Sequence, residues 1–109
     1  MKATIRNLIT ASLVCGTASL MTTAVWAADA AAGKAIYSAK CKSCHGAEGT
    51  PSAGMAKAMG IKPMGDPAIQ GKSDDDLKVS ITKGVGKMKA QPVSGADLDN
   101  VVAAIRTMK

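Results

Sequence analysis

Wherever the pattern of apolar and polar positions along the chain is regular, it has the period of a helix, and no stretch alternates like a strand. The clearest stripe lies near the C-terminus and consists of Leu98, Val101, Val102, Ile105 and Met108. Residues three or four positions apart share one face of a helix. Ser94 precedes the stripe and Asp97 follows it three positions later, an arrangement typical of a capping box. The pattern predicts a final helix that begins at Ser94.

An earlier helix is predicted from Asp29 to Lys40. Asp29 is a favourable N-cap residue, and the alanines that follow it are strong helix formers. Gly33 and Tyr37 lie one turn apart on one face. Because glycine costs about 1 kcal/mol relative to alanine inside a helix, we expect Gly33 to permit the close approach of another backbone.

A third helix is predicted to begin at Ser73. Three aspartates follow, where their negative charge suits the positive end of the helix dipole. Leu77 and Ile81 form its apolar face, and Gly84 is the expected C-terminal stop. Residues 46–71 are rich in glycine and proline and are expected to be loops, with one short helical turn from Met55 to Met59. These features predict an all-α fold with three main helices.

The first 27 residues have the pattern of a secretory signal peptide. Lys2 and Arg6 form a positive start, an apolar stretch without charge follows, and Val25-Trp26-Ala27 is a small-x-small cleavage site. Thr and Ser residues dilute the apolar stretch, which argues against an uncleaved membrane anchor. We therefore expect residues 1–27 to be cleaved, leaving one domain of residues 28–109 in the periplasm.

Composition limits what this domain can be. Tyr37 is its one aromatic residue, and a core of this size is marginal without a cofactor or a cross-link. The chain has 14 Lys and Arg against 8 Asp and Glu, and the basic excess remains without Lys2 and Arg6. The absence of interleaved aromatics and of a known motif argues against nucleic-acid binding. A basic surface instead favours docking on acidic proteins.

The segment Cys41-Lys42-Ser43-Cys44-His45 carries the strongest chemical signal. A CxxCH motif is typical of covalent haem attachment, with both thiols bonded to the haem and the histidine bound to its iron. A zinc site needs four ligands, whereas residues 28–109 contain two cysteines and one histidine. A thioredoxin-like site needs a βαβ pattern that this sequence lacks. Cys41, Cys44 and His45 are thus predicted to hold one haem c.

The second axial ligand of the iron cannot be another histidine. Met55, Met59 and Met108 are most simply core residues, because methionine readily fills gaps between apolar side chains. Met88 and Met64 lie in irregular segments and remain the two candidates. Met88 is favoured, since it sits in a polar, glycine-containing loop between two helices, where an isolated core residue is less expected.

The order of these features resembles a small class I c-type cytochrome over essentially the whole of residues 28–109. The motif CKSCH carries the resemblance, with support from the stretches ITKGVGKM and VVAAIRT. The resemblance implies helices and loops wrapped around one covalent haem, with Met88 as the second iron ligand. This sequence departs from the family pattern at two positions. At Lys89 a proline commonly follows the methionine, and at Ala104 an aromatic residue is usual.

With His45 and Met88 both bound to iron, the resemblance implies a soluble periplasmic one-electron carrier rather than an enzyme. Its expected partners are redox proteins with acidic docking surfaces, and it is expected to be a monomer without a membrane anchor. Lysines near the motif and the Met88 loop could steer docking; they are Lys40, Lys42, Lys83, Lys87 and Lys89. Two alternatives stay open, a haem-based ligand binder or weak peroxidase with a labile ligand, and an electron-entry subunit of a larger complex.

Overall fold

A computed structural model describes residues 27–109, and within them every regular element is a helix. The predicted signal peptide lies outside these residues except for Ala27. The six helices, in chain order, are α1 Ala30–Lys40, α2 Lys42–His45, α3 Ala53–Met59, α4 Pro67–Gln70, α5 Asp74–Lys83 and α6 Gly95–Thr107. The all-α prediction and its three main helices, α1, α5 and α6, are confirmed. The short helices α2 and α4 were not predicted.

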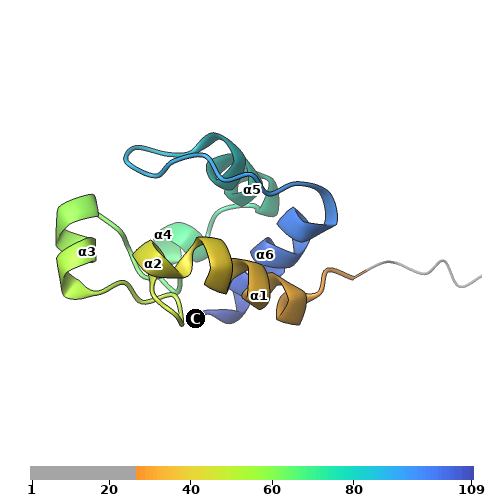
Figure 1. Ribbon diagram of the computed structural model, residues 1–109, viewed down its shortest axis with the longest axis horizontal. Coiled ribbons are helices and arrows are strands. Elements are labelled where there is room, and N and C mark those ends of the chain that lie inside the picture. The colour runs from red at the N-terminus through yellow and green to blue at the C-terminus, as the bar shows by residue number, and fades with distance from the viewer. Residues whose placement is uncertain (1–26) are drawn as a thin grey trace, which may run out of the picture.

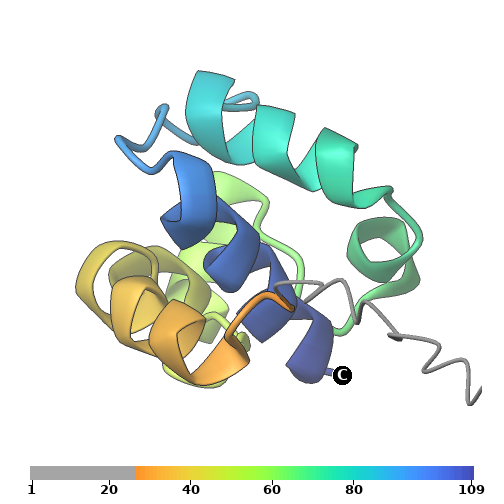
Figure 2. The same cartoon turned by 90° about the vertical axis from the view of Figure 1, so that its right-hand side faces the viewer.

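Helices α1 and α6 cross face to face, and α5 lies across α6 on another side (Figures 1 and 2). Gly33 makes the crossing close, because a Cβ at this position would overlap the backbone carbonyl of Asn100 in α6. The Asn100 side chain also accepts a hydrogen bond from the Asp29 backbone N–H at 2.7 Å. The predicted role of Gly33 is therefore confirmed.

The caps explain where two of the three main helices begin. The Asp29 carboxylate accepts hydrogen bonds from the N–H groups of Ala31 and Ala32, and the Ser73 hydroxyl accepts one from Asp76. Ser94 stands at the N-cap position of α6, but its side chain makes no capping hydrogen bond. The capping box predicted there is wrong.

The core lies between α1, α5 and α6 and includes residues from the loops. Its buried residues are Tyr37, Met64, Leu77, Ile81, Val93, Val101, Val102, Ile105 and Met108. The predicted apolar stripe of α6 contributes most of its members to this cluster. Ala104 is fully buried, so the family's usual aromatic side chain would need space that the surrounding chain now fills.

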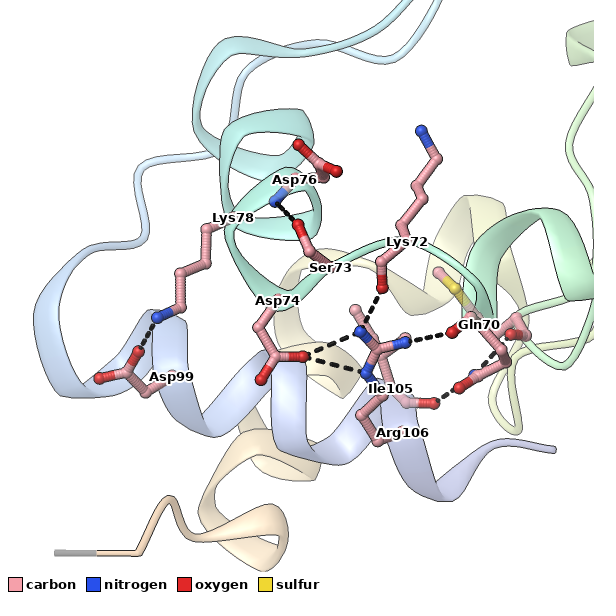
Figure 3. A network of polar contacts seen from close by, with 10 residues as sticks. Gln70, Lys72, Ser73, Asp74, Asp76, Lys78, Asp99, Ile105 and Arg106 are labelled. Carbon is pink, nitrogen blue, oxygen red and sulfur yellow. Dashed lines mark hydrogen bonds and ion pairs between the residues drawn. The ribbon is translucent and has the colours of Figure 1, made fainter.

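A polar network fixes the segment between α4 and α5 to the C-terminal half of α6 (Figure 3). The Arg106 guanidinium donates to the carbonyls of Gln70 and Lys72 and to the carboxylate of Asp74. The Gln70 amide donates to the carbonyls of Met64 and Ile105, at 2.7 and 3.0 Å. Carbonyl groups at the ends of helices and in the loops thus find side-chain donors here.

Tyr37 leads to a prediction about alkaline stability. Its hydroxyl donates to the Gly46 carbonyl at 2.7 Å, and burial raises its pKa from 10.0 to about 12. An acid whose pKa is higher in the folded state stabilises the fold fully below its unfolded pKa and loses that contribution as pH rises to the folded pKa. We expect the stability advantage of wild type over Tyr37→Phe to shrink between pH 10 and 12, by up to about 1.4 kcal/mol per pH unit. Urea unfolding at pH 7 and pH 11 measures it, and an equal advantage at both would contradict the prediction.

Candidate functional site

A cavity of about 500 Å³ opens between α2, the end of α3, α5 and the loop that follows α5. Much of its wall is apolar and comes from Met59, Ile61, Met64, Ile69, Leu77, Ile81, Val85, Met88 and Ile105. Its volume lies within the range of about 300–1,000 Å³ that is common for cofactor and small-molecule sites. The walls come from segments far apart in the sequence, so the fold itself creates this space.

The predicted attachment motif lies at one wall of the cavity. Helix α1 ends at Lys40, and Cys41 caps it with an N–H that donates to the Tyr37 carbonyl at 2.8 Å. A new helical turn then begins, with the N–H groups of Cys44 and His45 both donating to the Cys41 carbonyl. Because residues three positions apart share a helix face, Cys41 and Cys44 both reach the cavity, and His45 lines it beside them. All three side chains are half-buried.

Burial shifts the pKa values of two of these side chains. Burial raises the pKa of the Cys41 thiol and lowers the pKa of the His45 imidazole below its usual range. A neutral imidazole is the form that binds a metal. The Nδ1 atom of His45 is buried and has no hydrogen-bond partner among the described residues. An unpaired buried polar atom is unfavourable, so a group that engages this ring would fit the site.

The two methionine candidates differ in how tightly they are packed. Met64 is 7% exposed and belongs to the core, where Met108 and the backbone of Gly49 pack around it. Its N–H donates to the Gly49 carbonyl and its carbonyl accepts from Gln70. Met88 is only half-buried and lines the same cavity. Its side chain is therefore freer than that of Met64 to bind a group in the cavity.

Met88 is presented by a tight turn. The backbones of Val85 and Met88 exchange two hydrogen bonds, at 3.1 and 2.8 Å. Gly86 has φ +56° within this turn, and Gly84 has φ +79° just before it. A Cβ at Gly84 would overlap the Met88 carbonyl, so a glycine is needed there for the backbone to pass. The turn places Met88 in the wall formed by the loop after α5.

Five lysines line the cavity, and sequence reasoning found three of them. Lys40, Lys87 and Lys89 lie where they were expected, whereas Lys42 and Lys83 are not part of the lining. Lys62 and Lys72 belong to it and were not predicted, because their loops carry no pattern that indicates which way they fold. Met59 also lines the cavity and is 36% exposed, although the sequence suggested a core role for it.

A second hollow lies at the other end of α6, beside the start of α1. Its charged lining residues are Asp29, Asp74, Lys78 and Asp99. Lys78 and Asp99 form an ion pair there, and Lys78 has its pKa raised chiefly by a hydrogen bond to Asp99 (Figure 3). The described residues contain no cluster of three or more His, Cys, Asp or Glu side chains that could hold a metal ion. The first cavity, which is lined by Cys41, Cys44 and His45, is therefore the better candidate for the functional site.

Comparisons with known proteins agree with the chemistry of the first cavity. A family model described as cytochrome C oxidase, cbb3-type, subunit III matches residues 28–104. A solved structure titled "KustC0563 c-type cytochrome" is similar, with 25% identity and a TM-score of 0.62 over 71% of this chain and 96% of that chain. No curated protein matches. In residues 27–109 no helix is both long and apolar enough to cross a membrane.

Proposed function

Because this chain belongs to the cytochrome c domain family described as cytochrome C oxidase, cbb3-type, subunit III, and carries covalently attached haem c, we propose that it is a one-electron carrier of the periplasm. The observation that carries this proposal is the convergence of Cys41, Cys44, His45 and Met88 on one cavity. We assign the two cysteines to covalent attachment, and His45 and Met88 to the iron as axial ligands.

Haem iron with a histidine and a methionine ligand supplies one-electron chemistry, and the thioether ligand favours the reduced state. The protein's part is to hold and shield this group. Apolar side chains such as Leu77, Ile81 and Ile105 keep water from the inner wall of the cavity. The exclusion of water is one of the factors that set the reduction potential of a metal site. Two protein ligands would leave no coordination position for a substrate, which favours electron transfer over catalysis.

The lysines of the cavity support a partner with an acidic surface. All five are exposed residues that line the cavity; they are Lys40, Lys62, Lys72, Lys87 and Lys89. The aspartates Asp29, Asp74 and Asp99 gather instead at the second hollow. Such an uneven charge distribution orients a protein during its encounter with an oppositely charged partner, and the association rate then falls with added salt.

The proposed ligands are tested by the near-infrared spectrum of the ferric protein, in which a methionine–iron bond gives a charge-transfer band. We expect the band in wild type, its complete loss in Met88→Ala, and its retention in Met64→Leu. The reduction potential should fall in Met88→Ala alone, because the thioether that favours ferrous iron is lost. A band that persists in Met88→Ala and disappears in Met64→Leu would reverse the assignment. High-spin features in wild type would instead favour a ligand binder or weak peroxidase.

The family description favours one second candidate, an electron-entry subunit of a larger redox complex. The two roles differ in the size of the native particle. A free carrier extracted from the periplasm should sediment as a monomer. A subunit should sediment with a larger redox complex, and its haem should be reduced or oxidised within that complex.

A further inference from the structure

Helix α3 forms part of the cavity wall but is only loosely attached to the rest of the protein. It spans Ala53–Met59 and buries none of its side chains. In Figure 1 it stands at one end of the molecule, away from the crossing of α1 and α6. Its last residue, Met59, and the following Gly60 both line the cavity. A wall of this kind needs some contact that holds it against the opposite wall.

Lys87 provides that contact. Its Nζ donates a hydrogen bond of 2.8 Å to the carbonyl of Ala58, which is 29 residues away in the sequence. Among the described residues, this is the one hydrogen bond that joins residues 50–62 to another part of the chain. Ala58 lies in the last turn of α3, where carbonyl groups lack helical partners and a cation is favourable.

The same lysine is the residue directly before the proposed iron ligand. Its backbone lies inside the turn closed by the hydrogen bonds between Val85 and Met88, and that turn has only Gly86 as its other inner residue. Movement of Lys87 therefore moves Met88 with it. The bond from Lys87 to Ala58 therefore connects the wall that carries Met88 to the wall that contains Met59.

We propose that Lys87 is a positioning residue for Met88: its bond to the Ala58 carbonyl ties the Val85–Met88 turn to α3 and keeps Met88 in place against competing ligands. This inference rests on the proposed role of Met88 as an iron ligand. It gives Lys87 a task different from that of the other cavity lysines. Lys89 has the same charge and a position equally near to Met88, but its ammonium makes no hydrogen bond within the described residues.

The test is the affinity of the ferric holoprotein for imidazole, a small ligand that competes with methionine for iron. Loss of the near-infrared methionine band reports the competition. We expect Lys87→Gln to bind imidazole about fivefold more tightly than wild type, because an exposed hydrogen bond of about 1 kcal/mol corresponds to this factor. Lys87→Arg keeps a cationic donor and should remain within about twofold of wild type. Lys89→Gln removes the same charge without removing the bond, and should behave like Lys87→Arg.

Met88→Ala separates failure of this inference from failure of the ligand assignment. If Met88 binds iron, Met88→Ala should bind imidazole far more tightly than any lysine variant. A Met88→Ala affinity equal to that of wild type would overturn both proposals. A tight Met88→Ala together with an unchanged Lys87→Gln would overturn only the role of Lys87. An equal gain in Lys87→Gln and Lys89→Gln would also overturn it, since charge rather than the bond would then be responsible.

Discussion

Replacing Gly33 by alanine should destabilise the holoprotein by at least about 3 kcal/mol, the upper end of the usual range for overpacked sites. The added Cβ would overlap the backbone carbonyl of Asn100, and no rotamer change can move a backbone group away. The two helices would have to separate, and their crossing holds Tyr37 and Val101, which are each 1% exposed. A domain of this size has little stability to lose. Gly33→Val should prevent folding altogether.

Gly54→Ala is the matched control for this prediction. Gly54 also lies in a helix, α3, but nothing stands within 4 Å of the position its Cβ would take. Alanine favours helices over glycine, so Gly54→Ala should leave the midpoint of urea unfolding unchanged or raise it slightly. Equal effects of Gly33→Ala and Gly54→Ala would show that helix propensity, rather than the helix crossing, decides the outcome at position 33.

The sequence was most informative about helices whose signals are local. Asp29 and Ser73 cap α1 and α5 as expected, because an N-cap side chain bonds to a backbone only two or three residues ahead. Ser94 also stands at an N-cap position with an extended backbone, but its side chain makes no capping hydrogen bond. The short helices α2 and α4 are too brief to leave a periodic pattern, and tertiary packing decides whether they form.

In the candidate site, too, the sequence predicted the local part of the arrangement but not the part that depends on distant residues. Cys41, Cys44 and His45 lie within five consecutive residues, so one helical turn brings them together and the sequence is enough to group them. Their meeting with Met88 depends on the path of the whole chain. The bond from Lys87 to Ala58 and the bonds from Arg106 to the α4–α5 segment end on backbone carbonyls. Because every residue has a backbone carbonyl, the sequence does not indicate which carbonyls accept these hydrogen bonds.

The network around Arg106 leads to the second large prediction. Arg106 is the point at which α6 holds the end of α4 and the segment that leads to α5 (Figure 3). Ile69 of α4 and Lys72 of that segment belong to the cavity wall. Removal of the guanidinium would leave the carbonyls of Gln70 and Lys72 without this donor. Hydrogen bonds from charged groups contribute about 1.5–3 kcal/mol each. Because the Arg106 side chain is 28% exposed, water would replace part of what is lost, and we expect Arg106→Met to cost about 2–4 kcal/mol.

Asp74→Asn distinguishes the carbonyl bonds from the ion pair. The Asp74 side chain is 63% exposed, and an exposed pair contributes only about 0–1 kcal/mol. Asp74→Asn should therefore lower the free energy of unfolding much less than Arg106→Met, as measured by urea unfolding of the two holoproteins at pH 7. The reduction potential gives a second measurement. It should shift in Arg106→Met, because the wall at Ile69 loosens and admits water, and stay near the wild-type value in Asp74→Asn. If both variants lose the same stability, the ion pair rather than the carbonyl bonds holds this segment to α6.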